Sequence, residues 1–120
     1  MLIDDRMRNL AKLMDVAVLR HQVHAGNLAQ QNTPNYIARK VEFDQAFAEA
    51  VARGDNQAAR AVQAKVVENP SGSFDVDGNN VSPHEEAGIL AQNRILYETY
   101  VAALRGKGRL LDTAMRSPGG

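Results

Sequence analysis

The first part of the chain carries apolar residues at helical spacing. From Ile3 to about Leu28 they recur at alternating steps of four and three, which is the period of one helix face. A helix of that length is roughly 40 Å long, which exceeds the average globular helix and suits a bundle or a coiled coil. The pattern therefore predicts an N-terminal helix within residues 1–32.

A second long helix is predicted to begin after Ser82. Ser82 can cap the helix, Pro83 suits its first position, and Glu85 can reach back to the cap. Apolar residues then recur to about Met115, so we expect a helix over 82–116 and a short tail at 117–120. The residues expected on the seam between the two helices are Leu10, Leu13, Met14, Leu90, Tyr97, Val101, Leu104 and Leu111.

The middle segment, residues 33–81, differs from the two ends in composition and in expected secondary structure. Residues 41–64 are rich in alanine and predict partly helical structure with a break at 54–56. Residues 65–68 and 73–76 are expected to be short extended segments on either side of a turn. The sequence thus predicts one rod-type domain over 1–120. Its class is mainly α: an antiparallel coiled-coil hairpin of two long helices, with a short middle segment that contains a helix and short strands.

Composition narrows the class of function. Aromatic residues make up 5% of the chain and tryptophan is absent, so large side chains that could fill a core are few, and we expect other chains to complete it. The net charge is zero, which disfavours a nucleic-acid partner because phosphate binding requires a basic surface. No run of about 18 apolar residues exists, so we expect no membrane-spanning segment. Charged residues within 1–10 exclude the apolar core of a cleaved signal peptide.

Two groups of residues could bind a metal. His21 and His24 lie one helical turn apart, but the sequence shows no second pair of zinc ligands, and interfacial packing is the simpler interpretation. Residues 75–86 resemble a calcium loop with Asp75, Asp77, Asn79 and Glu86 as candidate ligands, although glycine is missing at the sixth place. A small calcium-binding or regulatory helical domain therefore remains an alternative. No nucleophile motif, phosphate loop or cofactor motif is present, so we expect no enzyme activity and no cofactor.

The stretch "NLAQQNTPNY", residues 27–36, ends the first helix with several amide side chains. Pro34 prevents continuation of the helix, and Asn35 tolerates a left-handed turn. We expect this stretch, named the elbow from here on, to fix the bend into the middle segment, with some amides bonding the same chain and others a neighbour. Its residues of interest are Asn27, Ala29, Gln30, Asn32, Thr33, Pro34, Asn35 and Tyr36.

The elbow resembles the N-terminal signature of bacterial flagellar axial proteins, the family of rod and hook subunits. That signature runs roughly Asn-Ile-Ala-Asn-x-x-Thr-Pro-Gly-Tyr; Gln30 replaces the second asparagine and Asn35 the glycine. Residues 39–43 (RKVEF), 77–81 (DGNNV) and the helix after Glu86 are similar to segments of the proximal rod subunits of this family.

This resemblance implies a structural subunit of the proximal rod of the flagellar basal body. It implies export by the flagellar type III system, assembly in the periplasm by helix packing, and transmission of torque from the motor to the hook and filament. The implied partners are further copies of the chain, FlgC-type rod subunits, the adaptor FliE, and the MS ring or export gate. Within this family, an alternative assignment is another short axial subunit, of the FlgC type.

Overall fold

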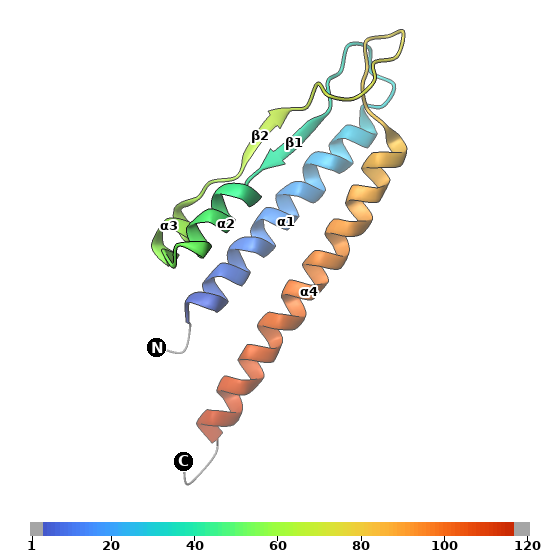
Figure 1. Ribbon diagram of the computed structural model, residues 1–120. Helices are drawn as coiled ribbons and strands as arrows, with labels where there is room; N and C mark the ends of the chain where they lie inside the picture. Colours follow the sequence, from blue (N-terminus) through green and yellow to red (C-terminus); the bar gives the residue numbers. More distant parts are fainter. Residues whose placement is uncertain (1–3, 117–120) are drawn as a thin grey trace.

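Two long helices dominate the computed structural model, which describes residues 4–116. Helix α1 (Asp5–Ala29) and helix α4 (Pro83–Arg116) lie side by side, and the start of α1 and the end of α4 point to the same end of the molecule (Figure 1). The molecule is elongated, with extents of 71 × 26 × 15 Å. The predicted mainly helical class, with long first and last helices, is confirmed. Residues 1–3 and 117–120, which the sequence analysis gave to the first helix and the tail, lie outside the described residues.

Local chemistry sets the ends of both helices. The Asp4 carboxylate accepts a hydrogen bond from the Met7 N–H at 2.9 Å and so caps α1. At the start of α4 the Ser82 hydroxyl accepts from the Glu85 N–H at 3.4 Å. Pro83 occupies the first helical position, where a backbone N–H would have no partner within the helix.

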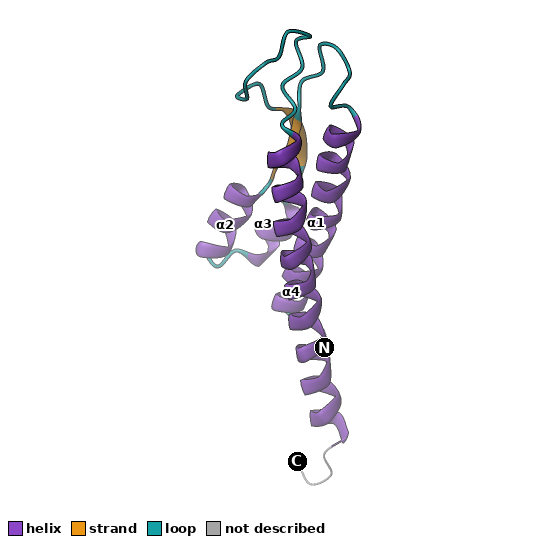
Figure 2. Cartoon of the chain, turned by 90° about the vertical axis from the view of Figure 1, so that its right-hand side faces the viewer, coloured by secondary structure: helices purple, strands orange, loops and turns teal. Residues whose placement is uncertain are grey.

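Helix α4 is longer than α1. The ammonium group of Lys107 lies 3.2 Å from a carboxylate oxygen of Asp4, at the beginning of α1. Residues 108–116 continue the helix past this point, which adds roughly 14 Å, and Figure 2 shows this end of α4 projecting beyond α1.

The middle segment contributes two short strands and two short helices. Strand β1 (Arg39–Glu42) pairs antiparallel with β2 (Lys65–Glu68) in a register that sets Arg39 opposite Glu68 and Glu42 opposite Lys65. Opposite charges at both ends of the ladder favour this register. The prediction of a strand at 65–68 is confirmed. The one at 73–76 is wrong, because this stretch leads into a hydrogen-bonded turn and β2 pairs with β1 instead.

Helices α2 (Asp44–Ala52) and α3 (Asn56–Ala61) form the helical part of this segment, and Gly54 at φ 73° makes the turn between them. Both lie to one side of the helix pair (Figure 2). Helix α3 begins at a second aspartate cap, where Asp55 accepts a hydrogen bond from the Ala58 N–H at 3.0 Å. The break predicted at 54–56 is confirmed.

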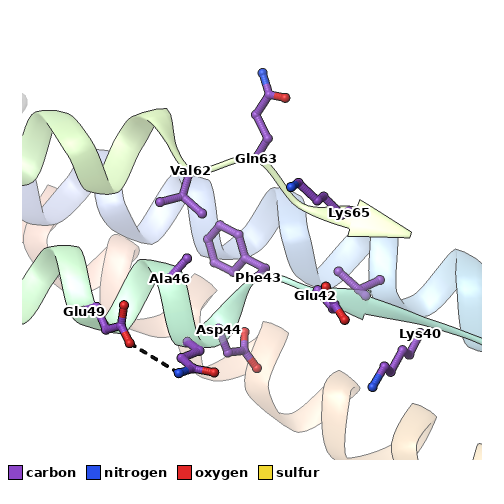
Figure 3. A pocket seen from close by; sticks show the side chains of 11 residues that line it. Lys40, Glu42, Phe43, Asp44, Ala46, Glu49, Val62, Gln63 and Lys65 are labelled. Atoms are coloured by element: carbon purple, nitrogen blue, oxygen red, sulfur yellow. Dashed lines mark hydrogen bonds between the residues drawn. The ribbon is translucent and has the colours of Figure 1, made fainter. Parts of the chain in front are cut away.

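The apolar core lies between α1 and the middle segment. Phe43 and Phe47 stack with ring centroids 5.0 Å apart, and both are buried together with Val16. Full burial of each ring stabilises the fold by about 1.5–3 kcal/mol. Figure 3 shows the Phe43 ring directed toward Val62, which closes the cluster from the far side.

The expected seam residues do not form a buried core between α1 and α4. Those that the structure describes are half-buried, Leu13 packs against the Phe43 cluster, and the side chain of Leu111 lies outside the described part. The half-buried residues of the expected seam are Leu10, Leu13, Met14, Leu90, Tyr97, Val101 and Leu104. The buried residues that bridge α1 and α4 by hydrogen bonds are mainly polar, and they gather near the elbow.

Candidate functional site

The elbow lies at the end of the molecule where α1 stops and α4 starts (Figure 1). Asn27 is completely buried there, and Gln30 and Tyr36 are half-buried. The other predicted residues of the elbow are exposed: Ala29, Asn32, Thr33, Pro34 and Asn35. The elbow therefore has an inner part that packs within the chain and an outer part that faces solvent.

Asn27 connects three segments. Its Nδ2 donates to the Arg39 carbonyl at 2.8 Å and to Glu86 Oε1 at 3.0 Å. Its Oδ1 accepts from the Arg39 N–H at 2.9 Å and from the Tyr36 hydroxyl at 3.2 Å. An amide side chain offers two donors and two acceptor positions, so all four are used inside the chain. Asn27 thereby fixes the end of α1 to the start of β1 and to the first turn of α4.

A buried pair of titratable groups stands beside Asn27. His24 Nδ1 lies 2.6 Å from Glu86 Oε2, and both side chains are 8% exposed. Glu86 therefore uses one oxygen for His24 and the other for Asn27. Burial of an unpaired carboxylate is costly, whereas this one is hydrogen-bonded on both oxygens. The pair ties the last turns of α1 to the first turn of α4.

Asn79 connects the loop before α4 to the end of α1. Its Nδ2 donates to the carbonyls of Gln30 and Thr33 at 2.8 and 2.7 Å, which also accept from the N–H groups of Thr33 and Tyr36. Its Oδ1 accepts from the Val81 N–H at 2.8 Å.

Asn80 joins the ends of the two strands. Its Oδ1 accepts from the Ala38 N–H at 2.6 Å, and its Nδ2 donates to the Asn69 carbonyl at 2.7 Å. The sequence analysis identified 77–81 as a motif but assigned it no contact with the elbow. The signal was the pair of adjacent asparagines, whose Nδ2 groups donate to carbonyls more than ten residues away.

Asn35 and Gly78 approach each other closely at the elbow. Asn35 has φ 61° and Gly78 has φ 78°, both in the left-handed region that favours these two residue types. The Asn35 N–H donates to the Asp77 carbonyl at 2.8 Å. A Cβ on Gly78 would lie 2.5 Å from Asn35 Oδ1, so only glycine fits without a shift. The left-handed turn expected at Asn35 is confirmed.

Three of the four proposed calcium ligands, Asp75, Asn79 and Glu86, have other partners. Glu86 bonds His24 and Asn27, and one oxygen of the Asp75 carboxylate accepts from the N–H groups of Asp77 and Asn79 at 2.9 and 3.1 Å. Asn79 directs its Nδ2 at carbonyls, and its Oδ1 accepts from the Val81 N–H. Among the side chains that the structure describes, no group of three or more His, Asp or Glu is placed to hold a metal ion.

The hollow in Figure 3 is bordered by side chains of both charges from β1, α2 and the stretch before β2, with Lys40 and Glu49 among them. Gln45 donates to the Glu49 carboxylate at 3.3 Å, as the dashed line shows. None of the described helices has the length and apolar character needed to cross a membrane.

A long helix pair whose ends are joined by buried polar contacts is the architecture that the resemblance of the elbow to flagellar axial proteins implies. No family model matches the chain, but curated proteins do. FlgB of Bacillus subtilis (strain 168) is 28% identical over 130 aligned positions, which cover 95% of each chain. FlgB of Aquifex aeolicus (strain VF5) is 31% identical over 104 positions, covering 81% of this chain and 82% of the relative. FlgB of Escherichia coli (strain K12) is 23% identical over 96% of both chains. The chain belongs to the FlgB family of flagellar basal body rod proteins.

Proposed function

We propose that this chain is a structural subunit of the proximal rod that assembles by packing its long helices against neighbouring rod subunits. In this proposal α1 and α4 act as one antiparallel coiled-coil hairpin. The middle segment lies on the outer side, and the elbow holds the two parts at a fixed angle. Membership of the FlgB family supports the assignment to the rod. The exposed apolar side chains of α1 and α4 support the proposed packing surfaces.

The observation that carries the proposal is a set of exposed apolar side chains on the two long helices. Ile95 and Leu96 of α4 are 64% and 38% exposed, and Val18 of α1 is 46% exposed. These three residues lie outside the core cluster around Phe43. Burial of one such side chain against a neighbour would contribute about 1.5–3 kcal/mol, so repeated copies can gain substantial stability from contacts that a single chain lacks.

The elbow supports assembly by making the subunit rigid before it meets a neighbour. Because Asn27 satisfies all its hydrogen-bonding positions within the chain, it does not depend on a partner. The exposed side chain of Asn32, on the outer part of the elbow, can contact an adjacent subunit. A rigid joint also suits a subunit that transmits torque from the motor to the hook and filament.

In the proximal rod, the partners of the subunit are further copies of the chain, FlgC-type rod subunits, the adaptor FliE, and the MS ring or export gate below. The subunit would reach the periplasm through the flagellar type III system without a cleaved signal peptide. Labelled density in isolated basal bodies tests this position. We expect the label at the base of the rod. A label elsewhere on the axis would show that the chain is another short axial subunit.

Rod assembly in cells that lack their own copy tests the packing surface. Ile95→Ser combined with Leu96→Ser should abolish rods seen by electron microscopy and abolish swimming. Val51→Ser, at a similarly exposed valine of α2 (42%), serves as the matched control and should leave both intact. Normal rods with both α4 substitutions present would contradict the proposed packing.

A second pair of substitutions tests the elbow. Asn27→Ala with Asn32→Ala removes one buried and one exposed amide, and we expect rods to fail. Unchanged assembly would show that the elbow does not act as a joint.

Calorimetry separates the rod subunit from the calcium-binding alternative. Because Glu86 and Asp75 already have partners, we expect no heat of binding at millimolar calcium. Binding at micromolar calcium would overturn the structural proposal in favour of a regulatory domain.

A further inference from the structure

Residues 73–77 present apolar side chains at the elbow end of the molecule. Phe74 is 49% exposed, and Val76 is fully exposed. Single exposed apolar residues are common on protein surfaces. Here two of them stand close together in one short stretch, next to Asp75 and Asp77.

Hydrogen bonds make this stretch rigid. The Gly78 N–H donates to the Asp75 carbonyl at 3.0 Å, and the Asp75 N–H donates to the Asn79 carbonyl at 2.9 Å. The Asp75 carboxylate accepts from two further N–H groups in the same turn. A preorganised loop loses little conformational entropy when it binds, so Phe74 and Val76 are displayed in a form ready for contact.

A groove on the same molecule could receive them. It encloses about 330 Å³ between α1 and α4, at the small end of the range for binding clefts, and its lining is mostly apolar. The lining residues that matter are Ala17, Val18 and His21 of α1 and Asn93, Arg94 and Tyr97 of α4.

One polar atom of the groove lacks a partner. Asn93 is only 4% exposed, and its Nδ2 donates to the Ala17 carbonyl at 2.8 Å. Its Oδ1 is buried and has no hydrogen-bond partner among the residues that the structure describes. Buried acceptors of this kind are rare.

The charges of the turn and the groove are complementary. Residues 69–81 contain Asp75 and Asp77 and no basic residue. The groove lining contains Arg94 and His21 and no carboxylate. Arg94 pairs with Glu98 at 3.3 Å, but their side chains are 79% and 64% exposed, and such surface pairs are weak. Arg94 is therefore able to turn toward an incoming aspartate.

We propose that the turn 73–77 of one copy seats Phe74 and Val76 in the α1/α4 groove of a second copy. This contact rests on the proposed rod function and names the surfaces that would join two copies. Because the turn and the groove are different patches of one chain, the contact is heterologous. The joined pair keeps one free groove and one free turn, so the contact can repeat in an open array.

Disulfide cross-linking tests the contact cleanly, because the chain has no cysteine. Val76→Cys together with Val18→Cys in the full chain should give a ladder of covalent oligomers under mild oxidation, since a disulfide forms only when the two Cα atoms approach within about 7 Å. The matched control is Val76→Cys with Val51→Cys, because Val51 and Val18 are similarly exposed, at 42% and 46%. We expect at least tenfold more cross-linked product from the groove pair than from the control pair.

Charge reversal provides a second readout on the groove pair. Arg94→Glu should reduce the cross-linked product several-fold, and adding Asp77→Arg should restore it. A yield equal to that of the control pair, or a yield indifferent to both charge reversals, would overturn the contact.

Rod assembly is scored separately in cells, so that the two proposals can fail separately. Normal rods without the specific cross-link would overturn only the contact between turn and groove. Absence of the tagged chain from rods would overturn the proposed function and this contact with it.

Discussion

Replacement of Asn27 by alanine is the most informative single change in the elbow. Asn27 is fully buried and makes four hydrogen bonds, which join α1 to β1, to Tyr36 and to Glu86. Asn27→Ala leaves these partner groups without their bonds and leaves the fold otherwise unchanged. The expected result is a large loss of stability from one small substitution.

The magnitude follows from the surroundings of each partner. Four hydrogen bonds at about 1 kcal/mol net each would cost about 4 kcal/mol. Tyr36 is half-buried and Arg39 is exposed, so water can replace part of their loss. Glu86 is buried, and a hydrogen bond to a charged group contributes about 1.5–3 kcal/mol. We therefore expect Asn27→Ala to lower the free energy of unfolding by about 2–4 kcal/mol.

Urea unfolding followed by circular dichroism measures this change. The free energies of the two chains can be compared if they depend on urea concentration with the same slope. Asn32→Ala is the matched control: Asn32 is exposed in the same elbow and should shift the free energy by less than about 0.5 kcal/mol. Asn27→Asp should be at least as damaging as Asn27→Ala, because it would set a second carboxylate 3.0 Å from that of Glu86. If Asn27→Ala were as stable as the unaltered chain, the elbow would not be held by this side chain.

Two further changes test other local conclusions. Gly78→Ala should destabilise the chain by about 1–3 kcal/mol, because a Cβ at φ 78° would lie 2.5 Å from Asn35 Oδ1. Gly88→Ala, at an open helical position, should stabilise the isolated chain by up to about 1 kcal/mol; equal effects in thermal unfolding would refute the distinction. The hydrogen bond from the Met7 N–H lowers the pKa of the Asp4 carboxyl below its ordinary value. The stability from this cap is complete above the ordinary pKa and is lost as the pH falls through the lowered one; an NMR titration of Asp4 with an ordinary midpoint would contradict this.

Sequence patterns predicted the parts of the fold that depend on local chemistry. The cap at Ser82 with Pro83 located the start of α4, and Gly54 located the break between α2 and α3. The left-handed conformation of Asn35 followed from its residue type and its place after a proline. In each case a few adjacent residues contain the information.

The packing of the core was harder to predict from the sequence. Periodicity assigned the apolar residues of α1 and α4 to each other, whereas Val16 packs on Phe43 and Phe47 of the middle segment. A helix with apolar residues on more than one face can pack against two neighbours at once, and spacing alone does not say which neighbour takes which residue. Strand β1 was missed for a related reason: its partner β2 lies more than twenty residues away.

The polar contacts of the elbow depend even more on tertiary structure. The sequence showed the amides near Asn27, and it showed Glu86 as part of a helix start or a calcium loop. It gave no sign that Glu86 meets both His24 and Asn27, because these residues are about sixty positions apart. The DGNNV segment entered only the family resemblance and the calcium-loop pattern, so its contacts with the elbow were missed.

Hydrogen exchange on the full chain, free and assembled in rods, tests the central claim most directly. That claim is that each subunit forms its elbow alone and completes its long helices by packing with neighbours. In the free chain, the amides of Ala38 and Arg39, which bond Asn80 and Asn27, should be protected, and protection along α1 and α4 should fall with distance from the elbow. In rods, both helices should become strongly protected. A free chain that is monomeric, fully helical and strongly protected throughout α1 and α4, with no gain on assembly, would contradict the account.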